Sequence, residues 1–344
     1  MHLGNPRPSR DLTVGSVALP NPVFLAPMCG ITDAPFRRLV ARLGAGLVVS
    51  EMTACAALAE GKALARLRLE RHGLGLHVVQ LAGREARWMA EGARIAAGAG
   101  ADIIDINMGC PARNVTNGQA GSALMRDLDH AVSLIAATVA AVDIPVTLKM
   151  RLGWDDRSIV APELARRAEQ AGVRLVTIHG RTRCQFYTGT ADWSAVRAVK
   201  DAVGIPVVVN GDVLDEDDAV SALRASGADA VMIGRGACGK PWLPGRIARY
   251  LATGRREGAP ALDDQLVLLL QLHDEMLTLY GTQLGGRQAR KHIGWALDAA
   301  AAETRTSVTD LKAWRARVLT IDEPAEVAGR LRDAFDAFKW KVAA

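Results

Sequence analysis

The chain has 344 residues, 49% of them hydrophobic and 23% charged, a composition that excludes intrinsic disorder and collagen-like repeats. Its net charge is +5, and residues 255–344 hold 13 basic and 13 acidic side chains, so the whole excess lies in residues 1–254 and a uniformly basic tail is excluded. No run approaches about 20 uncharged apolar residues, and the first 16 residues lack the apolar core of a signal peptide, so we expect a cytoplasmic protein without a membrane span.

Eight short apolar runs, rich in β-branched residues, recur through the first two thirds of the chain. Each ends in polar or glycine residues, which is the pattern of strands buried on both faces of a parallel sheet. Ala-rich segments with helical spacing separate them, and most of these close with a Gly-Ala or Gly-Val pair that stops the helix. The runs span residues 23–28, 47–52, 77–82, 103–108, 146–151, 175–181, 207–212 and 230–236.

Eight strand–helix units in about 230 residues predict an α/β fold of the (β/α)8 TIM-barrel type. A doubly wound open sheet uses the same alternation of elements and is the alternative. The placement of polar side chains favours the barrel, because barrel enzymes build their sites at the carboxyl ends of the strands. Nearly every run ends in a candidate of this kind: Met28, Glu51, Gln80, Asn107, Lys149, His179, Asn210 and Arg235.

The last part of the chain has a different pattern. Strand-like runs stop, and amphipathic helices are predicted over 265–281, 285–301, 309–320 and 324–340. We therefore expect a barrel domain over residues 1–250 and a small all-α helical bundle over residues 251–344.

Five cysteines are scattered along the chain with no CxxC pair, which fits reduced thiols better than a disulfide framework or a metal site. Cys110 stands in the sequence Asp-Ile-Asn-Met-Gly-Cys-Pro (105–111), at the end of the fourth run. Gly109 and Pro111 predict a tight turn there that holds the thiol at the barrel mouth. Because a thiol is mostly protonated at neutral pH, Cys110 is a candidate proton donor, and a buried structural cysteine is the alternative. The other four, Cys29, Cys55, Cys184 and Cys238, are not expected to act as acids.

Segment 105–111 resembles the active-site signature of the tRNA-dihydrouridine synthases, flavoenzymes that reduce uridine in tRNA. The resemblance continues in order along nearly the whole chain, from about residue 15, and is closest to the bacterial B-type branch. Its further motifs are APMCGITD (26–33), Gln80, TLKMR (147–151), IHGRTR (178–183), NGD (210–212), IGRGACGKPW (233–242) and GRQARKHIGW (286–295).

This resemblance implies an FMN cofactor, NADPH as the reductant, and a uridine of the tRNA D-loop as the substrate, with position 17 suggested by the B-type likeness. Reduction of the uracil C5=C6 bond requires a hydride at C6 and a proton at C5. The flavin would supply the hydride and Cys110 the proton. The family tendency is monomeric, and no stable protein partner is implied.

The resemblance also assigns a set of residues to the cofactor. For Lys149 a physical argument stands beside it: an inward ammonium in a barrel is costly unless an anion meets it, and a reduced flavin is an anion at its N1–O2 edge. An ion pair of Lys149 with Asp105 or Glu51 is the alternative, and His179 could be a structural histidine. The assigned residues are Pro27, Met28, Cys29, Gln80, Lys149, His179, Asn210, Gly211, Asp212, Gly234 and Arg235.

Phosphate binding is expected at the glycine-rich turns after the seventh and eighth runs, where barrels usually cradle phosphates. Residues 234–239 also spell GxGxxG, the dinucleotide fingerprint. Pro241 follows at once and no further β-α-β unit lies downstream, so this motif does not indicate a Rossmann domain.

Substrate contacts are expected from two places. In the barrel, Asn107 offers the paired donor and acceptor that a uracil edge demands. Arg151 and Arg181, in the TLKMR and IHGRTR motifs, are further candidates for substrate binding. In the tail, Arg287, Arg290 and Lys291 are spaced to share one helical face, which can grip a phosphate backbone or be a solvated face.

Two other functions remain open at this point. A barrel of the dihydroorotate dehydrogenase kind, with FMN and a free pyrimidine, would use similar flavin contacts but has no need of the tail. A tRNA-binding protein without catalysis would not need Gln80, Lys149, His179 and Cys110 together. The choice between NADPH and NADH, the uridine that is modified and the oligomeric state are not fixed by the sequence.

Overall fold

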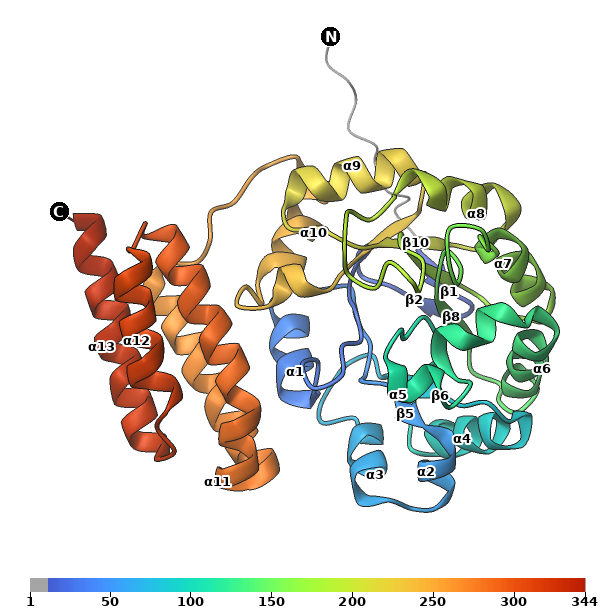
Figure 1. Ribbon diagram of the computed structural model, residues 1–344, viewed down its shortest axis with the longest axis horizontal. Helices are drawn as coiled ribbons and strands as arrows, with labels where there is room; N and C mark the ends of the chain where they lie inside the picture. Colours follow the sequence, from blue (N-terminus) through green and yellow to red (C-terminus); the bar gives the residue numbers. More distant parts are fainter. Residues whose placement is uncertain (1–11, 344) are drawn as a thin grey trace, which may run out of the picture. The chain divides into compact units, whose positions relative to one another are not determined.

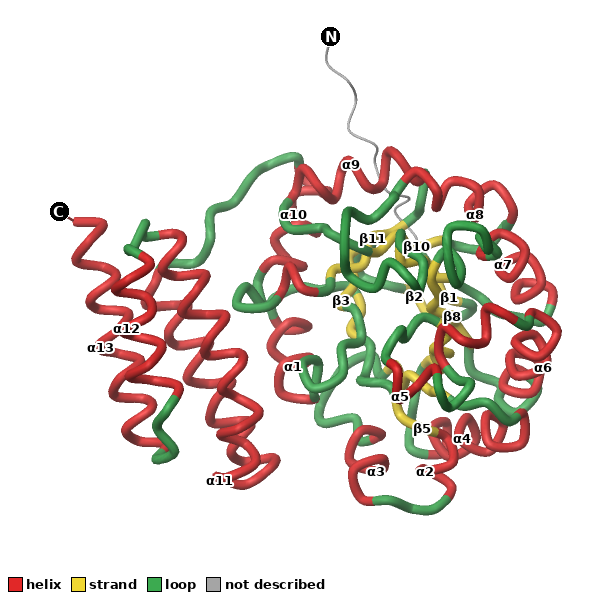
Figure 2. The backbone as a smooth tube through the Cα atoms, viewed as in Figure 1, coloured by secondary structure: helices red, strands yellow, loops and turns green. Residues whose placement is uncertain are grey.

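The computed structural model describes residues 12–343. The prediction that the first 16 residues form no signal peptide concerns a segment that lies mostly outside these described residues. A curled parallel sheet occupies the centre of the first part of the chain, with helices around it (Figures 1 and 2). Its strands are β3 (Val23–Leu25), β4 (Leu47–Val48), β5 (Thr53–Ala54), β6 (Val78–Ala82), β7 (Ile103–Met108), β8 (Val146–Arg151), β9 (Val176–His179), β10 (Val207–Asn210) and β11 (Ala230–Ile233).

The sheet closes on itself. At one seam β11 pairs with β3 in parallel, with Val231 opposite Val23. At the other, β4 and β5 are two pieces of one interrupted strand, joined to β6 by a bridge from Val49 to Val78 and by the β5–β6 ladder. The pairings at the two seams confirm the predicted TIM barrel, and the open doubly wound sheet is wrong.

The strand predictions agree closely with the structure. β7 and β8 coincide with the predicted runs and are buried along their whole length, as a parallel barrel strand with a helix outside and packed side chains inside must be. The strands β3, β9, β10 and β11 begin within one residue of the predicted starts but end two or three residues earlier than predicted. The second run breaks around Ser50 and Glu51, between β4 and β5.

Helices cover the outside of the barrel. They are α1 (Ala34–Arg42), α2 (Cys55–Ala59), α3 (Ala63–Leu69), α4 (Ala86–Gly98), α6 (Leu128–Val139), α7 (Ala161–Gln170), α8 (Arg197–Ala202), α9 (Glu216–Ser226) and α10 (Leu243–Thr253), with the short α5 (Arg113–Thr116) at the mouth. Three begin at an aspartate whose carboxylate accepts from a backbone N–H three residues on: Asp33, Asp127 and Asp215. Gly227 ends α9 in the left-handed conformation.

A small antiparallel hairpin, β1 (Thr13–Val14) and β2 (Val17–Ala18), precedes the barrel and was not predicted. Leu12, Val14 and Leu19 pack into the same buried cluster as the first residues of several barrel strands, such as Ile103 and Ala230. The hairpin therefore closes the amino end of the barrel, opposite the end where sites are built.

Four antiparallel helices form the C-terminal part. The segment α11 (Leu262–Glu303) is two helices joined at Gly281, whose φ of 77° and ψ of 167° are not helical. Gln265 near its start donates to Glu303 at its end over 2.8 Å, so the two halves fold back on each other. With α12 (Val308–Leu319) and α13 (Pro324–Ala343) they bury a core that includes Leu297, Leu331, Phe335 and Phe338. This confirms the predicted helical region.

The chain divides into two compact units. The barrel unit ends at Gly236 and takes up residues 244–256, and the helical unit consists of residues 237–243 and the chain from Glu257 onward. Gly239 shows why the short segment 237–243 is glycine-containing: its φ is +74°, and a Cβ there would meet the carbonyl oxygen of Trp295 at 2.3 Å. The predicted boundary after residue 250 lies within α10.

Candidate active site

The carboxyl ends of β6, β7 and β8 place a row of polar side chains side by side inside the barrel. Gln80, Asp105 and Thr147 are opposite one another in the strand register, and Asn107 is opposite Lys149 one step nearer the mouth. All five are buried. Inward positions alternate along a strand, so the register brings these side chains together although they lie far apart in sequence.

Cys110 lies on the turn that follows β7. The Asn107 side-chain oxygen accepts from the backbone N–H of Gly109 at 3.2 Å and of Cys110 at 3.0 Å. On the other side, Ser122 donates to the Cys110 carbonyl from its N–H at 3.1 Å and its hydroxyl at 2.9 Å. The turn is thereby fixed from two directions, with the Cys110 side chain half-buried at the mouth.

The other cysteines lie in different surroundings. Cys29 and Cys184 are exposed, on the loops after β3 and β9. Cys55 is fully buried, and burial raises the pKa of its thiol to about 12, so it stays protonated and unreactive. Cys238 is half-buried.

Lys149 is a buried ammonium that faces a neutral partner. Its Nζ donates to the side-chain oxygen of Asn210 at 3.0 Å, and Asn210 in turn donates to the Met232 carbonyl at 2.8 Å. Burial and the neighbouring Arg151 lower the pKa of Lys149 to about 8. The ion pair weighed above is not what the structure shows, since Glu51 pairs with Arg68 at 3.4 Å and Asp105 accepts from Gln80 and Thr147. Among residues 12–343, Lys149 thus has no carboxylate in direct contact, although the nearby charge of Asp105 partly offsets the lowering of its pKa.

Arg151 ties the cysteine turn to the loop after β9. Its Nε donates to the carbonyl of Gly109 at 2.9 Å, and its Nη1 donates to the carbonyls of Thr182 and Phe186, both at 2.8 Å. Its Nη2 makes no hydrogen bond within residues 12–343, so Arg151 keeps donors for a ligand. The half-exposed ring of Tyr187 lies beneath two guanidinium groups, with its centroid 5.5 Å from Cζ of Arg151 and 5.2 Å from Cζ of Arg235.

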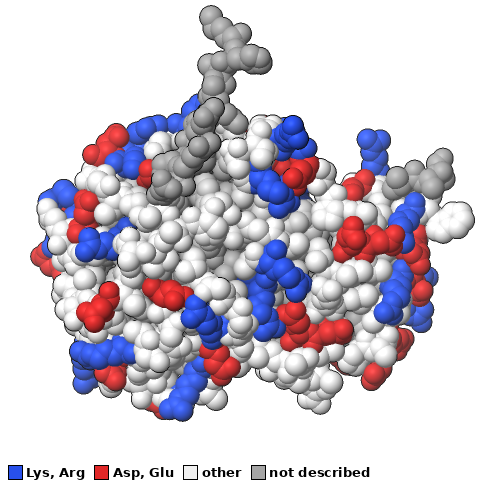
Figure 3. Space-filling view, turned by 180° about the vertical axis from the view of Figure 1, so that it is seen from behind, with Lys and Arg blue, Asp and Glu red and all other residues white. Residues whose placement is uncertain are grey.

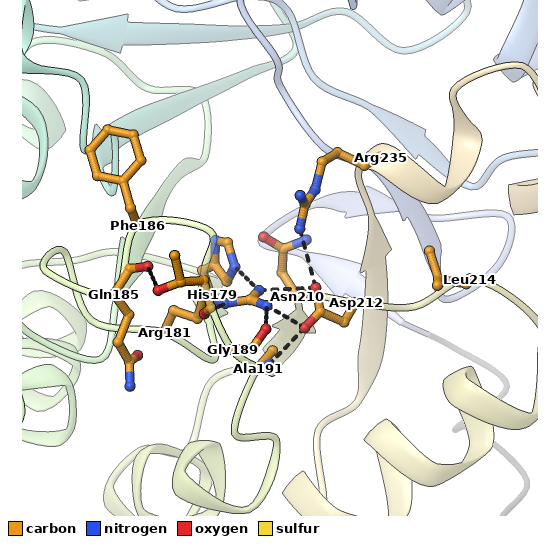
Figure 4. A network of polar contacts seen from close by, with 12 residues as sticks. His179, Arg181, Gln185, Phe186, Gly189, Ala191, Asn210, Asp212, Leu214 and Arg235 are labelled. Carbon is orange, nitrogen blue, oxygen red and sulfur yellow. Dashed lines mark hydrogen bonds and ion pairs between the residues drawn. The ribbon is translucent and has the colours of Figure 1, made fainter. Parts of the chain in front are cut away.

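The hydrogen-bonding groups of Arg181 are all used within the protein (Figure 4). Its guanidinium donates to both carboxylate oxygens of Asp212, at 3.0 and 2.5 Å, and to the carbonyls of Thr188 and Gly189. Nη1 also lies 3.3 Å from Nε2 of His179. These contacts engage all five N–H groups. The geometry makes Arg181 a brace for the loop after β9, and direct contact with a substrate stays only a prediction.

His179 is neutral in this setting. Burial and the cations around it, Lys149 first, lower its pKa well below the ordinary value. Because a guanidinium can only donate, Nε2 of His179 is the acceptor in its contact with Arg181, and the ring proton sits on Nδ1. His179 can therefore offer one N–H donor to a ligand.

The turns after β10 and β11 lie side by side. Gly211, with φ +122°, has no room for a side chain, since a Cβ would meet Ala191 at 2.7 Å and the His179 ring at 3.1 Å. Asp212 itself has φ +53° and is held by Arg181, by the Ala191 N–H at 2.7 Å and by Arg235 at 3.3 Å. A Cβ on Gly234 would lie 3.6 Å from the sulfur of Met28, so the end of β11 adjoins the half-buried Pro27–Met28 segment after β3.

The basic residues of the tail differ from one another. Arg290 is paired with Asp322 and anchors the loop before α13, whereas Arg287 is exposed and makes no hydrogen bond or ion pair with any described residue. Lys291 donates to Gln288 at 3.0 Å. Arg287 and Arg290 border a cavity of about 560 Å³ within the helical unit, together with the buried His273. On the face in Figure 3, basic and acidic side chains are intermixed on this unit, in line with its balanced charge.

Sequence reasoning missed some of the residues that build the site. Thr147 and Ser122 fix Asp105 and the cysteine turn, and Tyr187 stands exposed between two arginines. For Thr147 a signal existed, because it is two residues before Lys149 on the same strand and therefore on the same face. Ser122 lies 12 residues from Cys110 in a short 3-10 helix (Gly121–Arg126), and no spacing rule links the two positions.

A closed (β/α)8 barrel with a cysteine, a lysine, a histidine and amides at its carboxyl end defines an α/β-barrel enzyme. The family model described as "Dihydrouridine synthase (Dus)" matches residues 24–334. A "Probable tRNA-dihydrouridine synthase" of Rhizobium leguminosarum bv. phaseoli is 55% identical over 92% of this chain and 96% of the relative. Its counterpart in Rhodobacter capsulatus is 51% identical over 94% and 98%.

The chain belongs to the dihydrouridine synthase family and is thus an oxidoreductase. A relative named tRNA-dihydrouridine synthase B, from Xanthomonas campestris pv. campestris, is 44% identical over 95% of this chain and 96% of its own length, as the B-type resemblance predicts.

Solved structures agree on the fold. Morphinone reductase superposes with a TM-score of 0.51 at 16% identity, covering 76% of this chain and 94% of its own. Histamine dehydrogenase from Rhizobium sp. 4-9 reaches 0.57 at 13% identity, covering 98% and 65%. None of the helices among residues 12–343 is both long and apolar enough to cross a bilayer.

Proposed function

We propose that this protein is a tRNA-dihydrouridine synthase that reduces the C5=C6 bond of a D-loop uridine, with FMN as cofactor and NADPH as reductant. The observation that carries the proposal is the arrangement at the barrel mouth: the Cys110 turn is fixed by Asn107 and adjoins a buried lysine that makes no direct ion pair with a described residue. The family and the names of the relatives support the reaction and the tRNA substrate.

The residues present fit a flavin. Lys149, whose hydrogen bond to a described residue goes to a neutral amide, calls for an anionic edge such as the N1–O2 region of a reduced flavin, which would raise its lowered pKa again. His179 offers its Nδ1–H to a carbonyl, and Gln80 has a free side-chain donor and acceptor. The phosphate would lie at the turns 210–212 and 234–235, beside the exposed Arg235. When bound, the flavin supplies the hydride.

Cys110 is the proton donor in this proposal. Its turn is held by hydrogen bonds on both sides, so the thiol stands at a fixed position at the mouth. Arg151 and Asn107 both hydrogen-bond to the cysteine turn and keep unused N–H donors, and they would hold the carbonyl oxygens of the uracil. The uridine would have to leave its stack to reach them.

We assign RNA binding to the part of the helical unit that begins at Glu257. A barrel that reduced a free pyrimidine would need no such unit. Arg287, exposed and free of ion pairs with described residues, is available to contact a phosphate.

The test removes the thiol. Cys110→Ala should retain bound flavin, because no cofactor contact is assigned to that side chain, but lose turnover on tRNA by 100-fold or more, in the range of ~10²–10⁴ given by general acid catalysis. Dihydrouridine formed in tRNA that lacks it is the quantity to measure, with Cys184→Ala as the control. Normal turnover in Cys110→Ala would remove Cys110 as the acid. Faster reaction of the wild type with free uracil or orotate than with tRNA would contradict the proposed substrate.

A further inference from the structure

A continuous chain of buried hydrogen bonds runs from Thr147 to the cysteine turn. The Thr147 hydroxyl donates to Oδ1 of Asp105 at 2.6 Å, and Nε2 of Gln80 donates to Oδ2 of Asp105 at 2.7 Å. Nδ2 of Asn107 then donates to Oε1 of Gln80 at 2.8 Å, and Oδ1 of Asn107 accepts from the backbone of Gly109 and Cys110. Asp105 itself, 4% exposed, has no place in the function assigned above.

The direction of every bond in this chain follows from its two ends. At one end, backbone N–H groups can only donate, so the oxygen of the Asn107 amide must face them and its nitrogen must face Gln80. At the other end, Asp105 accepts from both Thr147 and Gln80. Burial raises the pKa of this carboxyl group, whereas the two hydrogen bonds and the nearby Lys149 lower it. With Oδ2 of Asp105 as the acceptor, the nitrogen of the Gln80 amide must face it. The two requirements agree, and neither amide can turn over without placing two like groups against each other.

These hydrogen bonds leave the Asn107 side chain with only a donor available for a ligand. Both lone pairs of its side-chain oxygen are used by the Gly109 and Cys110 N–H groups, and one hydrogen of its nitrogen is used by Gln80. What remains is a single N–H, which seeks an acceptor. The carbonyl at C4 of uracil is an acceptor, whereas cytosine carries an amino group there, and two donors cannot pair.

We propose that Asp105 is a positioning residue: by accepting from Gln80 it keeps the Asn107 amide turned with its N–H toward the substrate, and so selects a base with a carbonyl at C4. The proposal rests on the proposed function for its substrate, but the orientation of the amides is a property of the protein alone. Removing the acceptor at Asp105 leaves the Gln80 nitrogen without a partner in a buried place, which favours rotation of the Gln80 amide. A rotated Gln80 turns its nitrogen toward that of Asn107, so the Asn107 amide loses its acceptor and is held only by the two backbone N–H groups.

The first experiment needs no substrate. Amide hydrogen exchange of the segment around Gly109 and Cys110 is followed by mass spectrometry in the full-length protein. Asp105→Leu should speed exchange there about tenfold, since the Asn107 oxygen is no longer held in place. Asp102→Asn is the matched control: it changes a carboxylate just before the same strand, whose partners are Arg71 and the His77 N–H. Unchanged exchange in the Asp105 variant would overturn the positioning role.

The second experiment couples the variant to the base. Sulfur accepts hydrogen bonds poorly, so a tRNA with 4-thiouridine at the target should lower kcat/KM of the wild type about tenfold, the factor that one hydrogen bond gives. In Asp105→Leu, already about tenfold slower on ordinary tRNA, the thio penalty should shrink below threefold. The Asp102→Asn control should keep the full penalty. A full penalty in both variants would mean that Asp105 is only structural and would overturn the proposal.

Two further arms keep the outcomes distinct. Where Asp105→Leu does not fold, as judged by circular dichroism, Asp105→Asn takes its place with smaller changes in the same direction. A penalty from 2-thiouridine but not from 4-thiouridine would overturn the assignment to C4. Failure of the wild type to reduce tRNA at all would contradict the proposed function, while the exchange experiment would still decide the role of Asp105.

Discussion

The buried ammonium of Lys149 lowers the stability of the folded protein. The pKa of its ammonium is lowered from 10.5 to about 8, chiefly by burial. Between these two pH values the native state binds fewer protons than the unfolded state, so the free energy of unfolding rises with pH in that window. Below pH 8 both states are protonated and the full cost remains. The difference amounts to roughly 3 kcal/mol at about 1.4 kcal/mol per pKa unit.

Lys149→Met should therefore abolish this rise. Urea unfolding of the ligand-free protein at pH 7.5, 8.5 and 9.5 should show the wild type gaining stability relative to the variant as the pH increases. Lys200→Met is the control, because Lys200 is only partly buried and pairs with Asp229 at 2.7 Å. Parallel pH profiles for the wild type and Lys149→Met would show that the ammonium is not buried in solution.

The sequence predicted the residues at the strand ends better than their roles. Lys149, Asn107 and Gln80 could be placed at the mouth because side chains alternate along a strand and strands end at one edge. The bracing role of Arg181 could not be predicted, since two of its partners are backbone carbonyls of an irregular loop and its carboxylate partner, Asp212, lies 31 residues away on the turn after β10. That cysteine and lysine carry the chemistry stays a prediction until the variants are measured.

At the scale of elements, the break in α11 depends on one glycine. Gly281 has φ 77° and ψ 167°, a region that is essentially restricted to glycine, although nothing lies within 4 Å of where a Cβ would stand. Gly281→Ala should lower the free energy of unfolding by about 1–3 kcal/mol through backbone strain alone. Gly286→Ala, an open helical position, should be neutral or stabilising by up to about 1 kcal/mol. Equal melting temperatures for the two variants would argue against the fold-back.

Long elements were predicted well and short ones were not. The predicted helices 265–281 and 285–301 meet at the observed turn, because their apolar spacing is sustained over several turns. The hairpin β1–β2 has strands of two residues, too short for any periodicity, and its order comes from packing Leu12 and Val14 under the barrel. The interruption of the second strand also depends on a contact distant in sequence, because the Ser50 hydroxyl accepts from the Gln80 N–H at 2.9 Å.

At the scale of the molecule, charge separates two kinds of arginine in the helical unit. Arg287→Ala should raise the Kd for tRNA several-fold and reduce the slope of log K against log salt by about one, as the loss of one phosphate contact does. Its melting temperature should not change. Arg290→Ala should instead lower the melting temperature, because it frees Asp322 and the loop before α13. A tRNA affinity that is the same with and without Arg287, at low and at high salt, would contradict the assignment.

The closure of the barrel through β3 and β11 also sets an order for synthesis. The first barrel strand, β3, can complete its pairing only after Val231 of β11 has left the ribosome, some 200 residues later than Val23. Until then the nascent chain exposes two unpaired strand edges, which are sites of aggregation. The fold-back at Gly281 joins neighbours in sequence, and such local contacts form quickly. The slow step in making this protein should therefore be the meeting of its first and last strands, with the helical unit following at little cost in time.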